Sequence, residues 1–343
     1  MRLLILLLCL LSGPAFGQPE LSRGINVTGW FRFPVSRDPT VLAHYISDQA
    51  LADLRAAGFD FIRLAVDPEL LDTNALLLAI RRIQRQGLTV IVSPHPQDWR
   101  LESTDSAKLL RFWHIVAPAL RTLDPARTVP EVVNEPVFLN DPAGWGRLQH
   151  QVLTVIRAAL PQSMIVLTGQ DWGSIAGLLA QVPEDDPNVI YSFHFYDPAD
   201  LTSLAAYRSD VDHGALAALP FPAGGGCDVP ATDRPTRDLI RYHCASNWNA
   251  AHVAGEIERA AGWAQRHHVR LLAGEFGATT RLNRPARLAW LQTVRQDLEK
   301  KGISWTLWGY DDIMGFAVSR PIPPRPELDA GVLAALGMTT GMR

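Results

Sequence analysis

The chain has 343 residues, of which 47% are apolar and 20% are charged, and its formal net charge is −3. This composition allows a large buried core and excludes a mostly disordered chain. No basic stripe is present, so the sequence does not indicate a nucleic-acid partner.

The first residues have the layout of a secretory signal peptide. Arg2 precedes a run of about nine apolar residues, and a Gly-Pro break leads to Ala15 and Gly17, small residues that favour cleavage after Gly17. The run is shorter than the roughly 20 residues that span a bilayer. We therefore expect residues 1–17 to be removed, and the mature protein to be secreted or periplasmic with no membrane span.

Short apolar runs alternate with helix-like stretches along the rest of the chain. The runs predict strands at 24–30, 59–66, 88–95, 129–135, 164–169, 189–196, 270–277 and 303–310. Apolar residues recur at helical spacing in 47–57, 74–86, 106–123, 145–159, 250–267 and 284–300. This alternation predicts an α/β fold, a (β/α)8 TIM barrel, as a single domain over 18–343. A doubly wound sheet is the alternative, but no glycine-rich phosphate turn follows the first strand.

One connection, 197–249, is unusually long and is predicted to contain no regular helix. It holds a glycine triplet and the two cysteines of the mature chain, Cys227 and Cys244. In an exported protein such a pair indicates one disulfide rather than two free thiols. Closing a loop of about 17 residues would stabilise the fold by ~3 kcal/mol. We expect this segment to wall one side of a cleft, with a tolerated surface insertion as the alternative.

Polar side chains collect at the predicted carboxyl ends of the strands, where active sites of such barrels lie. Glu135 and Glu275 follow strands on opposite sides of the barrel and would face each other across its mouth. Two facing carboxylates, one protonated and one ionised, carry out glycoside hydrolysis. Taken alone, Glu135 also fits a surface acid. Glu131, in the same strand, is ambiguous and fits a buried structural acid paired to an arginine.

The other residues at the strand ends suit supporting roles. We expect Arg63 and the Tyr196 hydroxyl to keep Glu275 ionised, and burial and the second acid to raise the pKa of Glu135. Asn134 has an amide suited to a sugar 2-hydroxyl. His95 and His194 have imidazoles suited to further hydroxyls, and Trp308 offers a flat indole face.

Two further tryptophans follow strands near the same face of the predicted barrel. We expect Trp30 and Trp172 to be sugar platforms, with core packing as the alternative for each. No paired histidine spacing indicates a metal site, and no Gly-x-Ser-x-Gly elbow indicates a serine esterase.

The ordered set of residues resembles glycoside hydrolase family 5, the cellulase-like retaining glycosidases, over essentially the whole mature chain. The matching positions are Arg63, His95, Asn134-Glu135-Pro136, His194 and Tyr196, Gly274-Glu275-Phe276-Gly277, and Trp308. The resemblance implies Glu135 as acid/base and Glu275 as nucleophile in a double displacement with retention. It implies carboxyl groups about 5–5.5 Å apart, and neither a metal nor another cofactor.

We therefore expect a secreted hydrolase of β-linked glucan that acts as a monomer on poly- or oligosaccharides in the endo-β-1,4 mode. Exo-β-1,3-glucanase and β-mannanase activities fit the same fold. A catalytically silent carbohydrate-binding barrel is the alternative from another class, although the intact pair of glutamates argues against it.

Overall fold

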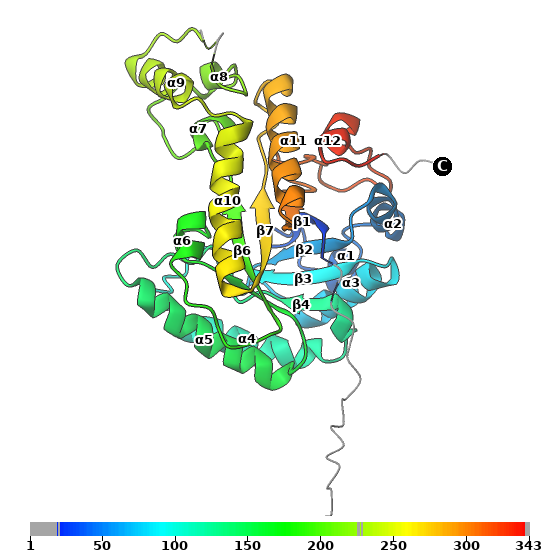
Figure 1. Ribbon diagram of the computed structural model, residues 1–343. Helices are drawn as coiled ribbons and strands as arrows, with labels where there is room; N and C mark the ends of the chain where they lie inside the picture. Colours follow the sequence, from blue (N-terminus) through cyan, green and yellow to red (C-terminus); the bar gives the residue numbers. More distant parts are fainter. Residues whose placement is uncertain (1–18, 20, 225–226, 228, 340–343) are drawn as a thin grey trace, which may run out of the picture.

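A computed structural model describes residues 19, 21–224, 227 and 229–339. The predicted signal peptide, 1–17, lies outside these residues. Eight parallel strands form one sheet in the order β4-β3-β2-β1-β8-β7-β6-β5 (Figure 1). Their bounds are β1 Arg23–Phe31, β2 Phe61–Val66, β3 Thr89–Pro94, β4 Thr128–Pro130, β5 Ile165–Thr168, β6 Val189–Phe195, β7 Arg270–Phe276 and β8 Ser304–Leu307.

The two end strands of this sheet, β4 and β5, meet and nearly close it into a barrel. A parallel bridge joins Glu131 to Val166, and the Val132 amide donates to the Val166 carbonyl at 3.0 Å. The predicted (β/α)8 architecture is confirmed. The fourth strand is shorter than predicted, because regular pairing ends at Pro130 and the chain then bends away toward Glu135.

Helices connect the strands and cover the outside of the barrel. They are α1 Pro39–Ala43, α2 Asp48–Ala57, α3 Thr73–Arg85, α4 Ser106–Leu120, α5 Pro142–Ala159, α6 Ile175–Leu179, α7 Ala199–Thr202, α8 His213–Leu216, α9 Arg234–Ser246, α10 Ala250–His267, α11 Arg284–Lys300 and α12 Ala330–Ala335. In Figure 1, α10 and α11 flank β7, whereas α4 and α5 lie along the lower edge.

The prediction that 197–249 contains no regular helix is wrong. The segment includes α7, α8 and the longer α9, which gather at the upper left of Figure 1. Helix α9 begins after Asp233, whose carboxylate accepts from the Thr236 amide, and a proline occupies its first turn. These are ordinary start signals for a helix. Cys227 and Cys244 form a disulfide that ties α9 to the loop before it.

The barrel interior has two layers that differ in chemistry. A buried apolar cluster fills the amino-terminal half and consists of Leu21, Phe61, Ile91, Val129, Met164, Val166, Ile190 and Leu272. Two residues further along the same strands lie buried polar side chains, namely Arg63, Ser93, Glu131, Thr168 and Ser192. Alternate residues of a strand face the same side of the sheet, so the chain contributes to both layers at β2, β3, β4, β5 and β6. The polar layer lies directly beneath the carboxyl ends of the strands.

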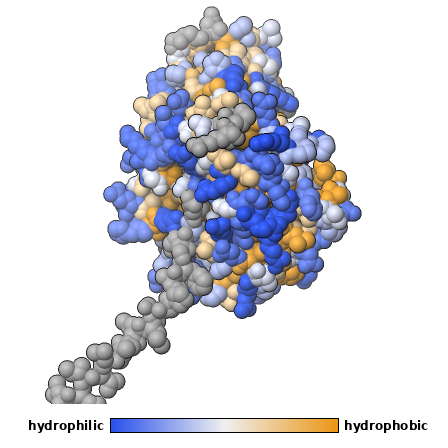
Figure 2. Space-filling view, turned by 90° about the vertical axis from the view of Figure 1, so that its right-hand side faces the viewer, coloured by the Kyte–Doolittle hydropathy of each residue, from blue (hydrophilic) through white to orange (hydrophobic). Residues whose placement is uncertain are grey.

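The outer surface seen from the side of α12 is mainly hydrophilic, with hydrophobic residues in separate small groups (Figure 2). Among the described residues, no helix is both long and apolar enough to cross a membrane.

Candidate active site

Arg63 lies at the centre of a buried network inside the barrel. Its Nε and Nη2 donate to the two carboxylate oxygens of Glu131 at 2.7 and 2.8 Å. Its Nη1 donates to Oε1 of Glu275 at 2.6 Å and to Oδ1 of Asn26 at 2.9 Å, and Nη2 also reaches Oδ1 of Asn134 at 2.8 Å. A bidentate pair of this kind fixes the guanidinium in one orientation. Glu131 is therefore the structural acid paired to arginine that the sequence left open.

Glu275 points into the barrel because β7 contains an irregularity. The register between β6 and β7 shifts near Gly274, so that Glu275 lies opposite His194. Strict alternation from the inward-facing Leu272 would turn Glu275 outward, and the bulge re-aims it. A Cβ atom on Gly274 would lie 2.4 Å from Oγ of Ser192. The bulge therefore depends on a glycine at this position.

Glu135 lies on a bend after β4 rather than at the end of a strand. Its φ of 39° is in the left-handed region, which non-glycine residues rarely adopt and which often marks functional sites. The Asn134 amide donates to the Pro94 carbonyl at 2.9 Å and ties this bend to the end of β3. The Glu135 side chain is 33% exposed, whereas that of Glu275 is 4% exposed. Glu135 is thus open to a ligand, and Glu275 lies deeper.

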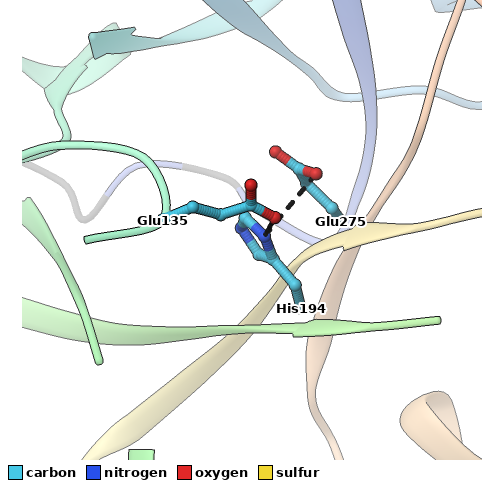
Figure 3. Close-up of side chains that lie close together, drawn as sticks. All are labelled: Glu135, His194 and Glu275. Carbon is cyan, nitrogen blue, oxygen red and sulfur yellow. Dashed lines mark hydrogen bonds and ion pairs between the residues drawn. The ribbon is translucent and has the colours of Figure 1, made fainter. Parts of the chain in front are cut away.

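The two carboxylates and His194 form a compact cluster (Figure 3). One oxygen of each carboxylate and one ring nitrogen of His194 lie within 4.8 Å of one another. Nδ1 of His194 is 2.9 Å from Oε1 of Glu135 and 3.5 Å from Oε2 of Glu275. The Tyr196 hydroxyl donates to Oε2 of Glu275 at 2.9 Å. The spacing of the Glu135, His194 and Glu275 atoms would allow a metal ion to bind. However, both oxygens of Glu275 already accept hydrogen bonds from protein donors, so the residues do not favour a metal site.

The pKa directions of the two glutamates are opposite to our expectation. Burial raises the pKa of Glu135, but the hydrogen bond from His194 and the positive charges of His194, Arg63 and Arg32 outweigh it and leave the pKa below its ordinary value. Burial raises the pKa of Glu275, and the nearby positive charges do not fully offset this. The predicted raised pKa of Glu135 is therefore wrong.

His194 and Tyr196 complete the electrostatics of the cluster. Burial lowers the pKa of His194, but the carboxylates of Glu275 and Glu135 together raise it above its ordinary value. The lowered pKa of Glu135 and the raised pKa of His194 both depend in part on the 2.9 Å contact between Nδ1 of His194 and Oε1 of Glu135. Burial and the same carboxylates raise the pKa of Tyr196, which keeps its hydroxyl protonated as a donor to Glu275.

His95 and Trp308 lie at the rim of this cluster. Their rings stack with centroids 5.7 Å apart. Both ring nitrogens of His95 are buried without a partner among the described residues. Burial, together with the charges of Arg63, Arg32 and His194, lowers the pKa of His95 and keeps its ring neutral.

The two tryptophans predicted as sugar platforms lie in different surroundings. Trp30 is fully buried, stacks on Phe31 and donates its indole N–H to the Leu42 carbonyl. The prediction that Trp30 is a platform is therefore wrong, because its faces are used in packing beneath α1. Trp172, in contrast, is 53% exposed and has a φ of 53° on the loop after β5.

A groove of about 770 Å³ opens beside Glu135. Its lining includes Arg32, His95, Arg100, Asn134, Glu135 and Trp172. Arg32 and Arg100 were not among the residues predicted for the site. Arg32 follows the first strand in the Trp- and Phe-rich segment 29–33, where its charge was the signal that could have been noticed.

Comparison with known proteins places this geometry in a family. Residues 21–312 match the family model described as cellulase (glycosyl hydrolase family 5). The chain belongs to glycosyl hydrolase family 5. Most of the chain lies within the match, including each strand of the barrel and every polar residue predicted at the strand ends.

Relatives in family 5 are distant in sequence. The chain is 23% identical over 333 residues to endoglucanase 3 of Fibrobacter succinogenes, and the match covers 84% of this chain and 49% of that protein. It is 19% identical over 312 residues to endoglucanase C of Acetivibrio thermocellus, with 84% and 90% covered. The chain thus spans about half the length of the first relative and most of the second.

Solved structures in the family share the fold. Endoglucanase Cel5A from Thermotoga maritima superposes with a TM-score of 0.74 at 21% identity, covering 92% of this chain and 96% of that one. A xyloglucanase from Bacteroides ovatus gives a TM-score of 0.67 at 17% identity, covering 92% of this chain and 74% of that one.

Proposed function

We propose that the protein is an exported, endo-acting β-1,4-glucanase that works by double displacement with retention. The observation that carries the proposal is the pair Glu135 and Glu275, whose carboxylate oxygens come within 4.8 Å of each other. Retaining glycosidases place these groups about 5–5.5 Å apart, whereas inverting ones leave roughly 6.5–9.5 Å for a water molecule. The relatives named endoglucanase support glucan as the substrate.

In the first step, Glu275 acts as the nucleophile and Glu135 as the acid. A Glu275 oxygen forms an ester bond to the anomeric carbon while the bond to the leaving sugar oxygen breaks. That oxygen takes the proton of Glu135, which His194 supplies across the 2.9 Å contact between Nδ1 and Oε1. Arg63 and Tyr196 hold the Glu275 carboxylate in position for attack.

In the second step, the roles of Glu135 and Glu275 reverse. Ester formation removes the negative charge of Glu275, so the neighbouring Glu135 loses a like charge and its pKa falls further. Glu135 then takes a proton from water, and the water oxygen attacks the anomeric carbon. The ester bond breaks, Glu275 leaves as a carboxylate, and the product keeps its original configuration.

Asn134 is suited to hold the sugar at its 2-hydroxyl. Its amide oxygen accepts from Arg63 at 2.8 Å, so the NH2 group is the part of the amide that remains to donate to a sugar in the groove that Asn134 lines. A hydrogen bond of this kind strengthens as charge develops on the ring. Trp172, exposed in the same groove, offers a flat apolar face to a neighbouring pyranose.

We also propose that 18–343 forms one catalytic domain that acts as a monomer after removal of residues 1–17. The segment 197–249, closed by the Cys227–Cys244 disulfide, would wall one side of the cleft. Thr202 at the end of α7 supports this position, because its carbonyl accepts from the Thr279 amide at 2.8 Å, in the loop that follows Glu275.

A β-mannan substrate is the second candidate. The Thermotoga maritima Cel5A structures include complexes with cellobiose and with mannotriose. The candidate substrates are separated by assays on cellulose derivatives, mixed-linkage β-glucan, β-1,3-glucan and β-mannan, with analysis of product length. Internal cleavage of β-1,4-glucan is expected. Release of single end sugars from β-1,3-glucan, preferred cleavage of mannan, or binding without hydrolysis would replace the proposal.

A further inference from the structure

The groove beside Glu135 contains two arginine side chains that the proposed mechanism does not use. Arg32 follows β1 and Arg100 lies in the loop after β3, and both line the groove. Within the described part of the chain, neither guanidinium has a hydrogen-bond or ion-pair partner, and the Nε of Arg32 is buried without one.

The acids that line the same groove are in the opposite situation. Glu102 accepts a hydrogen bond from the Asn140 amide at 3.0 Å, and Glu135 faces Nδ1 of His194 at 2.9 Å. Each groove carboxylate therefore already has a protein donor, whereas neither groove guanidinium has a protein acceptor. Partial removal of a cation from water costs free energy when no anion pairs with it, and an anionic ligand can offset that cost.

Arg32 lines the groove and lies beside the aromatic rings of Trp308 and Phe33. Its guanidinium carbon lies 5.8 Å from the Trp308 ring centroid and 4.9 Å from that of Phe33. Burial and the charge of Arg63 lower the pKa of Arg32, and the carboxylates of Glu275, Glu135 and Asp312 offset this only in part. A pyranose that reaches Trp308 therefore meets the guanidinium, which presents a planar fork of donors suited to carboxylate or phosphate oxygens.

We propose that the groove selects β-glucan chains that carry anionic substituents, and that Arg32 is the specificity-determining residue, assisted by Arg100. The inference rests on the proposed function, since it names the class of glucan that the same site takes. A charge-assisted, bidentate contact at this position distinguishes a carboxylate or phosphate ester from a neutral hydroxyl.

The test compares two soluble polymers of matched chain length and degree of substitution, carboxymethyl cellulose and hydroxyethyl cellulose. The kcat/KM ratio of the anionic to the neutral polymer is measured for the wild type and for Arg32→Gln, Arg32→Lys and Arg100→Gln. We expect Arg32→Gln to lower this ratio about ten-fold, Arg32→Lys to keep much of it, and Arg100→Gln to have a smaller effect. Added salt should lower the wild-type ratio because it screens the charges.

A matched control is Arg234→Gln, which removes the same charge from an arginine with an 84% exposed side chain on α9. Its ratio should equal that of the wild type. An equal fall in kcat/KM for both polymers in Arg32→Gln would overturn the inference, because it would mean that Arg32 only supports Trp308. A ratio unchanged by Arg32→Gln would overturn it as well.

Calorimetry keeps this test separate from a failure of the proposed hydrolysis. Cellotetraose is compared with cellotetraose bearing a carboxylate or a phosphate at C6, using the wild type and Arg32→Gln. Tighter binding of either charged sugar that is lost in Arg32→Gln supports the inference even if no polymer is cleaved, and the two charged sugars identify the preferred anion. Equal binding of all three sugars by the wild type contradicts it.

Discussion

The two layers of the barrel interior use the same strands for opposite purposes. The lower layer, formed by residues such as Phe61 and Ile91, is apolar and fully buried. The upper layer lies two residues further along the chain at β2 to β6 and contains Arg63 and Glu131, which are equally buried but charged. A step of two residues keeps the side chain on the same side of the sheet, so only chemistry separates the layers.

The two layers differ in how much they contribute to stability, and the layer that contributes less is the one that carries the active-site residues. Apolar burial in the lower layer stabilises the fold at about 25 cal/mol per Å² of apolar surface. In the upper layer the desolvation of Arg63, Glu131 and Glu275 opposes their mutual attraction, and such networks contribute little net stability. What the upper layer provides is orientation, because Arg63 holds Glu275 and Asn134 in fixed positions.

The largest expected effects belong to the two acids at the top of the upper layer. Glu135→Gln should lower kcat on β-glucan by roughly 10²–10⁴-fold, because the leaving oxygen is no longer protonated. Glu275→Gln should lower it further, since no covalent intermediate forms. Aryl glycosides with acidic phenols separate the roles in stopped-flow assays, because their departure needs no proton.

On such aryl glycosides, Glu135→Gln should retain a fast release of phenol followed by slow turnover, whereas Glu275→Gln should show no burst. A burst in Glu275→Gln would mean that the two roles are assigned to the wrong residues. Arg234→Gln serves as the control with normal kinetics on both substrate types.

Substituting one residue in each layer tests whether the two layers stabilise the fold in different ways. Arg63→Met leaves Glu131 and Glu275 buried without their cation and should lower the free energy of unfolding by about 3–5 kcal/mol. Ile91→Ala should lower it by a similar amount, about 2–5 kcal/mol, through a cavity. We expect the two variants to differ in how their loss of unfolding free energy depends on pH, which urea unfolding at about pH 5 and about pH 8 measures.

In Arg63→Met, Glu275 loses a positive charge that lowers its pKa, so its already raised pKa rises further and the penalty is relieved as Glu275 becomes protonated at low pH. The deficit relative to the wild type should therefore shrink at the lower pH. The deficit of Ile91→Ala should stay constant. A pH-independent deficit for Arg63→Met would argue against a charge network in the upper layer.

The proton held by His194 predicts the shape of the pH–rate profile. Activity requires ionised Glu275, whose pKa is raised, so kcat/KM should fall as pH drops through that pKa. It also requires the proton shared by His194 and Glu135, so it should fall as pH rises through the raised pKa of His194.

His194→Gln removes the titrating ring and should reduce kcat by roughly 10²-fold. It should also move the alkaline limb to lower pH, because a carboxyl group alone then holds the proton. An alkaline limb unchanged from the wild type would show that His194 does not store the proton.

A smaller effect is expected outside the barrel, at Trp172. Replacing this exposed ring with alanine should raise KM for long glucan chains by about ten-fold or less, with kcat nearly unchanged, because only uniform binding is lost. Trp30→Phe provides the contrast. It should affect stability but not KM, since Trp30 is buried beneath α1.

The sequence could predict the elements that follow from periodicity and order along the chain. The strand–helix alternation gave the barrel, and the order of polar residues at the strand ends gave the cluster around Arg63. It could not predict which way a side chain points after a strand ends. Trp30 and Trp172 both follow strands, yet one donates to the Leu42 carbonyl within the core and the other is exposed.

Other features depended on contacts between distant segments. The bulge at Gly274 that turns Glu275 inward needs both the local glycine and the pairing of β7 with β6, and the pairing cannot be read from the local sequence. The lowered pKa of Glu135 depends on His194, which lies 59 residues away along the chain. Helix α9 was missed although Asp233 and the following residues carry helix-start signals, because the glycines, prolines and cysteines around them favoured a loop.

Covalent trapping tests the central claim most directly. A 2-fluoro cellobioside with an activated leaving group slows the second step, so an ester intermediate accumulates and can be located by peptide mass spectrometry. The account predicts one adduct, on the peptide that contains Glu275, and its absence in Glu275→Gln. An adduct on any other residue, or hydrolysis of β-glucan to products of inverted configuration, would contradict the account.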